Sequence, residues 1–128
     1  MSVKNKQIVE KVNAAFSENK PEGFLDACAD NVEWTIVGDQ SFKGKDAIRK
    51  FMSSMKGQEP PKFTVEETIA EGDSVVCYGT MKMADDKGIV GDYSYVDAYR
   101  FSGDKIDRLQ SFVVKHKTEG EKSGKATA

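Results

Sequence analysis

Residues 91–112 read Gly-Asp-Tyr-Ser-Tyr-Val-Asp-Ala-Tyr-Arg-Phe-Ser-Gly-Asp-Lys-Ile-Asp-Arg-Leu-Gln-Ser-Phe, and this stretch predicts two long antiparallel strands joined by a tight turn at 102–105. Alternate side chains of a strand point to the same face of a sheet. The residues that share one face of the first strand are Tyr93, Tyr95, Asp97, Tyr99 and Phe101. Four aromatic side chains around one carboxyl group indicate the wall of a pocket rather than a plain core.

Apolar residues also occupy the even positions Val96 and Ala98, so both faces of this strand are expected to be covered. The preceding segments 63–69 and 75–83 alternate apolar and polar residues, and turns at 71–73 and 85–88 separate them. We therefore expect an antiparallel meander over the C-terminal half of the chain.

The N-terminal half has the pattern of helices with one inserted strand. Apolar residues at helical spacing predict a helix over 3–18, a short helix from Pro21 that ends at 30–31, and a third helix from Asp46, whose carboxylate is expected to cap it. The third helix includes Met55 and is expected to stop at Gly57 and Pro60. The segment 32–37 predicts a strand, followed by a loop at 38–41. This order predicts an α+β fold in which the helices cover one face of a curved antiparallel sheet.

Length and charge limit the class of protein. The 128 residues suit one domain, which we place at 1–115, and the polar segment 116–128 is expected to be a disordered tail. The net charge is −2 and no apolar run is long enough for a membrane span, so neither nucleic acid nor a membrane is an expected partner. Cys28 and Cys77 are expected to be buried, reduced thiols, which is typical of a cytoplasmic protein.

Familiar catalytic motifs are missing from the sequence. Gly38 to Gly44 has the wrong spacing for a phosphate-binding loop, and Asp46 stands where that loop needs Ser or Thr. His116 is the only histidine, so a metal site built on paired histidines is excluded. We expect neither a metal nor a cofactor.

Three segments in order resemble the nuclear transport factor 2-like superfamily, in its SnoaL-like or ketosteroid isomerase-like branch. They are Ala-Asp-Asn-Val-Glu-Trp at 29–34, Phe-Lys-Gly-Lys-Asp-Ala-Ile-Arg-Lys-Phe at 42–51, and Asp-Ala-Tyr-Arg-Phe at 97–101 followed by Gly-Asp-Lys-Ile at 103–106. The resemblance implies a cone: a curved antiparallel sheet with three helices on its concave side, the cystatin-like arrangement, and a pocket inside.

The resemblance also marks the positions of catalytic groups. The base of the isomerases falls on Ile36 or its neighbours Thr35 and Val37, and their helical tyrosine falls near Val12, so ketosteroid isomerisation itself is not expected. Only the carboxylic acid that donates to the oxyanion has a counterpart, at Asp97.

Asp97 is therefore the candidate catalytic residue, either as a desolvated pocket acid or as a structural carboxylate. In the structural alternative it is bonded to a tyrosine hydroxyl or to Arg49, Arg100 or Arg108. Trp34 is either a stacking wall for a ligand or part of the core. The expected ligand-binding residues are Trp34, Ile36, Phe51, Cys77, Tyr93, Tyr95, Tyr99 and Val113.

Three functions remain open at this point. The first is a cofactor-free acid–base enzyme of the isomerase, cyclase or hydrolase type that acts on a small apolar compound with a carbonyl or hydroxyl group. The second is a pocket that binds such a compound without turnover, and the third is a protein-interaction domain. We also expect a homodimer through the outer face of the sheet, where Val76, Tyr78, Val96, Ala98, Phe112 and Val114 gather.

Overall fold

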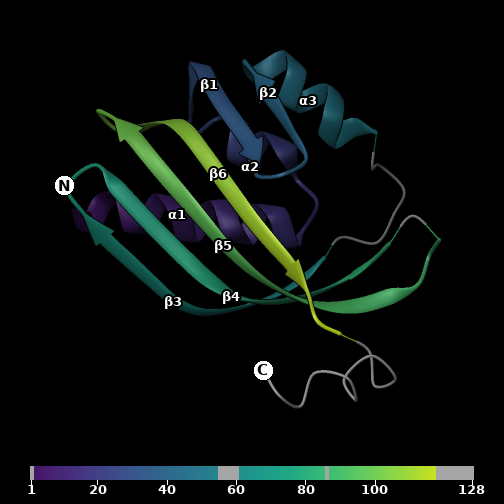
Figure 1. Ribbon diagram of the computed structural model, residues 1–128. Coiled ribbons are helices and arrows are strands. Elements are labelled where there is room, and N and C mark those ends of the chain that lie inside the picture. Colours follow the sequence, from purple (N-terminus) through teal and green to yellow (C-terminus); the bar gives the residue numbers. More distant parts are fainter. Residues whose placement is uncertain (1, 55–60, 86, 118–128) are drawn as a thin grey trace.

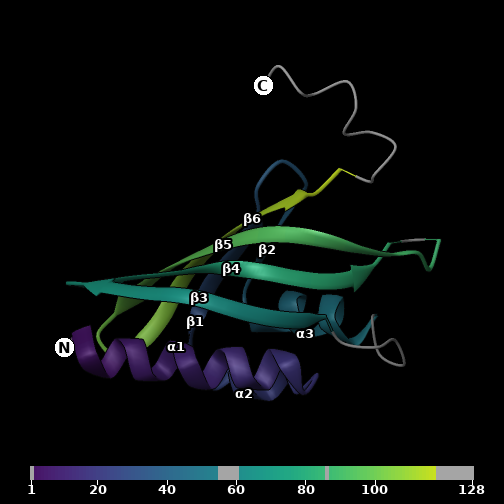
Figure 2. The same ribbon diagram turned by 90° about the horizontal axis from the view of Figure 1, so that it is seen from below.

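The computed structural model describes residues 2–54, 61–85 and 87–117. Its elements in chain order are α1 (Ser2–Ser17), α2 (Pro21–Leu25), β1 (Cys28–Ile36), β2 (Gln40–Lys43), α3 (Lys45–Ser53), β3 (Lys62–Glu71), β4 (Ser74–Ala84), β5 (Val90–Ser102) and β6 (Lys105–Lys115). The six strands form one curved, unclosed sheet in the order β2-β1-β6-β5-β4-β3 (Figure 1). The helices lie along its concave side (Figure 2), so the predicted α+β fold is confirmed.

The central hairpin has the predicted faces. Strands β5 and β6 pair antiparallel, and the odd-numbered residues from Tyr93 to Phe101 are buried on the concave side. Helix α1 packs against β3 and β4, and its Val9 and Val12 are fully buried. The concave face and α1 together therefore enclose the hydrophobic core.

Two β-bulges bend the sheet. One adds Asp107 to β6 opposite Arg100 and Phe101 of β5, and the other adds Glu66 to β3 between Val65 and Glu67. A bulge adds a residue to one strand and increases its local bend. The bulge on β3 also reverses the faces beyond it, so Ile69 lies on the outer face with its partner Val76, and not on the face of Phe63 as the alternation predicted.

The bend of β3 depends on Gly79 of β4. A Cβ atom at this position would lie 1.9 Å from the main-chain oxygen of Thr64 and 3.0 Å from the main-chain nitrogen of Glu66. Because both of these atoms belong to the backbone, a side chain at position 79 cannot be accommodated by a rotamer change. Glycine allows β3 to fold closely over β4 at this point.

Some predictions for the N-terminal half are wrong. The short helix ends at Leu25, strand β1 begins earlier than predicted, and the supposed loop 38–41 runs into strand β2, which pairs antiparallel with β1. The β1–β6 pair is parallel, whereas a wholly antiparallel sheet was predicted.

The start of α3 also differs from the prediction. Gly44, with φ of 85°, holds the N-cap position, and no side chain caps the helix. Asp46 instead pairs with Arg49 one turn later, at 3.0 Å. The predicted end of this helix, including Met55, Gly57 and Pro60, lies outside the described residues.

The remaining sequence predictions concern cysteines, membrane spans and the tail. Cys28 and Cys77 are both buried and free. Over the ranges that the structure describes, no helix is long and apolar enough to span a bilayer. His116, the first residue of the predicted tail, bonds to β5: its main-chain N–H donates to the Asp92 carbonyl at 2.8 Å, and its imidazole lies 2.7 Å from the Ser94 hydroxyl. Residues 118–128 lie outside the described part.

The outer face of the sheet carries an apolar surface across three strands. Register pairs place Val76 beside Ala98, and Tyr78 beside Val96, which in turn pairs with Phe112. In the single chain Val96 is 38% exposed and Phe112 is 41% exposed. A surface of this kind is typical of a protein–protein contact.

We expect this surface to join two copies of the chain, and Phe112→Glu to dissociate them, because a charge would be buried in a self-complementary contact. Sedimentation at micromolar concentration should show a dimer for the unaltered protein and a monomer for the variant. Val3→Glu is the matched control, since Val3 is exposed on α1, away from this face. A monomeric unaltered protein would contradict the prediction.

Candidate functional site

A polar row crosses the otherwise apolar concave face. Asp97 of β5 pairs in register with Cys77 of β4 on one side and with Ser111 of β6 on the other. Ser111 in turn pairs with Ile36 of β1. The residues Cys77, Asp97, Ser111 and Ile36 are called the polar row below. The neighbouring row is Val75, Tyr99, Leu109 and Trp34.

Asp97 is the acidic group of this row. Its side chain is buried, with the residue 8% exposed, and this desolvation raises the pKa of Asp97 to about 6. A hydrogen bond with Ser111 favours the charged form and partly opposes the rise in pKa. A carboxyl group of this kind can both take and give a proton near neutral pH.

The Ser111 hydroxyl also contacts the indole of Trp34, whose Nε1–H donates to Oγ at 3.0 Å. Trp34 is half-buried in an aromatic cluster with ring centroids 5.6–6.3 Å away, formed with Phe16, Phe24, Phe42 and Phe51. The ring thus belongs to the core and at the same time supplies a polar contact to the row.

Two tyrosine hydroxyls, from the residues that flank Asp97 on its face of β5, have no hydrogen-bond partner within the described part of the chain. They belong to Tyr95 and Tyr99, which are 3% and 2% exposed. Burial and the nearby Asp97 carboxylate raise the pKa of both phenols, so both remain protonated donors. Buried polar groups are rarely left unpaired, and each exception needs an explanation.

Helix α1 adds an amide to the site. The Asn13 side-chain N–H lies 3.8 Å from the Cys77 sulfur, which is a weak acceptor. Burial raises the pKa of the Cys77 thiol to about 12, so this cysteine is a neutral neighbour and not a nucleophile. The sequence reasoning missed both Asn13 and Ser111, because neither residue belongs to a motif.

The other predicted ligand-binding residues lie at different depths. Tyr93 is buried on the same face as Asp97, and Phe51 of α3 stacks on Phe42, with the ring centroids 4.4 Å apart. Val113 pairs with Tyr95 but is 37% exposed, so it lies toward the open end of the sheet. Ile36 stands beside Ser111 in the polar row, at the place where the resemblance puts the isomerase base.

No arginine pairs with Asp97 within the described residues. Arg49 binds Glu22 and Asp46 on the helical surface, with N–O distances of 2.9 and 3.0 Å. Arg100 binds Asp107 at 3.0 Å, and Arg108 is the register partner of Arg100 on the outer face. The residue that lowers the pKa of Asp97 is instead its neutral register partner Ser111.

The described residues contain no cluster of three or more side chains that could hold a metal ion. The chemistry that the row can supply is therefore one exchangeable proton on Asp97, together with neutral donors from two tyrosines and an amide. This combination suits a neutral ligand that is mostly apolar and carries one or two oxygen atoms.

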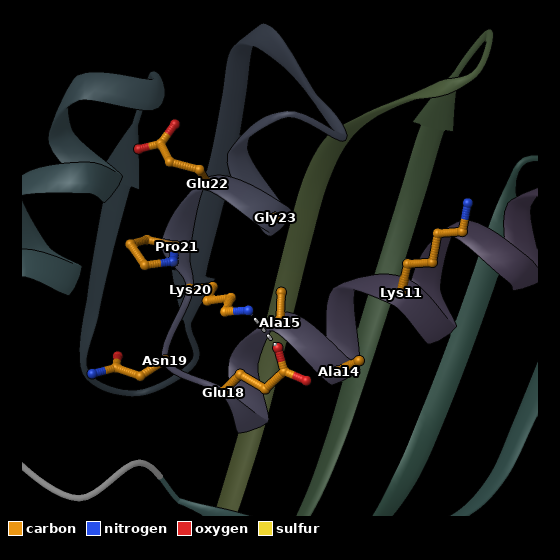
Figure 3. Close-up of a pocket in the computed structure, with 9 residues that line it drawn as sticks. All are labelled: Lys11, Ala14, Ala15, Glu18, Asn19, Lys20, Pro21, Glu22 and Gly23. Atoms are coloured by element: carbon orange, nitrogen blue, oxygen red, sulfur yellow. Dashed lines mark ion pairs between the residues drawn. The ribbon is translucent and has the colours of Figure 1, made fainter.

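A separate hollow of about 560 Å³ lies outside this region. It is formed where α1 meets α2, and its lining includes Lys11, Glu18, Lys20 and Glu22 (Figure 3). The Lys20 ammonium pairs with the Glu18 carboxylate at 3.1 Å. None of the residues in the polar row contributes to this hollow.

The sequence profile of the SnoaL-like domain family matches residues 9–109. No curated protein matches the sequence. A solved structure of a nuclear transport factor 2-like protein of unknown function from Cytophaga hutchinsonii is 25% identical, with 85% of this chain aligned to 98% of that chain at a TM-score of 0.71.

Two further solved structures extend the comparison. A nuclear transport factor 2-like protein of unknown function from Burkholderia pseudomallei is 22% identical over 98% of each chain, with a TM-score of 0.78. A protein from Jannaschia described as a SnoaL-like polyketide cyclase is 19% identical over 84% of this chain and 85% of that chain, with a TM-score of 0.71. These similarities establish the fold.

Proposed function

Because the chain belongs to the SnoaL-like domain family of the nuclear transport factor 2-like superfamily, we propose that it binds a small apolar compound bearing a carbonyl or hydroxyl group and exchanges a proton with it through Asp97. The reaction needs neither metal nor cofactor. Proteins with this fold include ones described as a polyketide cyclase, an epoxide hydrolase and a ketosteroid isomerase.

The observation that carries the proposal is the buried Asp97, flanked on its face of β5 by two tyrosines whose buried hydroxyls have no partner within the described part of the chain. A ligand oxygen placed at the polar row would accept hydrogen bonds from these hydroxyls and satisfy them. The Asp97 carboxylate can then remove a proton from a carbon next to the ligand carbonyl and return it to another atom of the same molecule, which regenerates the carboxylate.

Proton transfer by a single carboxyl group suits isomerisation or ring closure better than hydrolysis. Hydrolysis requires a base for the water and an acid for the leaving group. Asp97 is the only acidic side chain of the polar row, and Ile36 offers no base. A pocket that binds the compound without turnover is the second candidate, and it is favoured by the same lack of a second acid or base.

Proton exchange can be measured without knowing the natural substrate. We would screen neutral alicyclic and aromatic ketones, their alcohols and the parent hydrocarbons by thermal shift, and include polyporic acid because a structural neighbour was co-crystallised with it. Ketones that bind should then be incubated in D₂O, and their α-hydrogens followed by NMR. Exchange that depends on Asp97 supports the proposal, whereas binding without exchange supports the second candidate.

We expect Tyr99→Phe and Tyr95→Phe to weaken ketone binding about tenfold each without lowering the melting temperature. The reason is that each change removes an unpaired hydroxyl from the core and a donor from the ligand. Tyr78→Phe is the matched control, since its hydroxyl donates to Glu67 on the outer face at 2.6 Å. Equal binding by all three variants would exclude the tyrosines from the site.

A further inference from the structure

The Ser111 hydroxyl stands between an indole N–H and a carboxyl group. Its oxygen accepts from Trp34 Nε1 at 3.0 Å, and Ser111 is the register partner of Asp97 on the neighbouring strand. An indole nitrogen can only donate, so the Ser111 oxygen must be the acceptor in the first contact. The proton of Ser111 itself is then free to point toward Asp97.

Both ends of this arrangement are fixed. The Trp34 ring packs edge-on against Phe24 and Phe51, with centroid distances of 5.9 and 5.6 Å. The Ser111 carbonyl accepts the Val37 main-chain N–H at 2.9 Å, just beyond β1. The position of Ser111 is therefore fixed by its main-chain carbonyl and by the hydrogen bond from Trp34. Only the direction of the hydroxyl proton remains free.

No charged side chain competes for Asp97 within the described ranges. The groups that face it are the neutral Cys77 thiol from β4, the Tyr95 and Tyr99 phenols from β5 itself, and the Asn13 amide of α1 close to that thiol. Burial works against the ionised carboxyl, and the Ser111 hydroxyl is the group that works in its favour. The charged form of Asp97 thus depends on one hydrogen bond.

We infer that Ser111 is the positioning residue of Asp97, and that Trp34 sets the direction in which the Ser111 hydroxyl donates. The indole fixes the oxygen as an acceptor, the hydroxyl proton faces the carboxylate, and one carboxylate oxygen remains for the ligand. The importance of this arrangement for catalysis rests on the proposed function, but the arrangement itself is tested on the protein without any ligand.

The test is an NMR titration of the carboxyl carbons in ¹³C-aspartate-labelled protein, with the Asp97 signal assigned by its loss in Asp97→Asn. Ser111→Ala should move the midpoint upward by on the order of one pH unit, because a hydrogen bond to the charged form is lost. Ser111→Thr keeps the hydroxyl and should restore the midpoint. Ser94→Ala removes an outer-face hydroxyl and should leave it unchanged.

Trp34→Phe tests the role of the indole, since it keeps an aromatic ring and removes the N–H. It should move the midpoint in the same direction as Ser111→Ala, but less. In the double variant the midpoint should equal that of Ser111→Ala alone, because Trp34 acts only through Ser111. Additive shifts would overturn the role of Trp34.

An unchanged midpoint in Ser111→Ala would overturn the proposal, whatever happens to stability. If Ser111→Ala fails to fold, the other two variants still test the proposal. A shifted Asp97 midpoint in Ser111→Thr, or an unchanged midpoint in Trp34→Phe, would contradict it. Shifted midpoints in a protein that binds none of the screened ketones would support the Ser111 arrangement and reject the proposed function.

Discussion

Asp97→Asn is expected to abolish proton exchange with any bound ketone and to raise the free energy of unfolding at pH 7 by about 3 kcal/mol. The first effect follows because an amide cannot take a proton from carbon at neutral pH. The second follows from linkage: the pKa of Asp97 rises from 3.8 to about 6 on folding, and each unit corresponds to about 1.4 kcal/mol.

The sign of the pH dependence is fixed by the direction of this shift. A carboxyl group with a raised pKa binds more protons in the folded state, so stability falls as pH rises through the window between the two values. The loss of stability caused by ionisation of the buried Asp97 is absent below pH 3.8 and complete above about pH 6. Asp97→Asn removes this slope, so the two proteins should be equally stable near pH 4 and differ at pH 7.

Urea denaturation at several values between pH 4 and pH 8 measures this difference. Asp92→Asn is the control: Asp92 is an exposed carboxylate on the same strand, and its hydrogen bond with Lys82 lowers its pKa. That change should give no gain at pH 7. A loss of several kcal/mol in Asp97→Asn would mean that Asp97 holds the fold together through its charge, and would contradict its proposed role as a proton-exchanging acid.

Gly79→Ala is expected to destabilise the protein by about 3 kcal/mol or more. The new Cβ would lie 1.9 Å from the Thr64 carbonyl oxygen, and only a backbone shift at the β3 bulge can relieve the overlap. Gly91→Ala on β5 is the matched control, because the nearest atoms to its new Cβ would be side-chain atoms at 3.5 Å, an ordinary van der Waals distance.

Thermal and urea unfolding of both glycine variants decide the point. Gly91→Ala should remain within about 1 kcal/mol of the unaltered protein, since alanine also restricts the unfolded chain. Similar losses in the two variants would show that the close approach of β3 to β4 is not what position 79 requires.

The sequence predicted the face of β5 correctly because a period of two residues is a local property of the chain. Tyr95, Asp97 and Tyr99 share a face in any extended strand. The residues that lie opposite these positions on neighbouring strands do not follow from the local pattern. Counting back from the turn pairs Ser102 with Lys105 and Phe101 with Ile106, and an unbroken ladder would bring Gln110 to Asp97.

The extra residue Asp107 on β6 changes that count by one and brings Ser111 to Asp97 instead. A one-residue shift exchanges the two faces of a strand. Which residue of β6 lies beside Asp97 therefore depends on a bulge that no residue type in the sequence indicates. The parallel β1–β6 pair was not predicted for a related reason. It joins segments that are far apart in the sequence, whereas turn residues indicate pairing only between consecutive strands.

The parallel β1–β6 pair also has a consequence for how the chain folds. The Trp34–Ser111 bond spans 77 residues, and β1 has no other inner neighbour in the sheet than β6. Contacts of such separation form slowly, because a long loop must be closed first. During synthesis β1 therefore cannot pair with β6 until nearly the whole meander has emerged. The hydrogen bond that orients the Ser111 hydroxyl is thus among the last parts of the molecule to be completed.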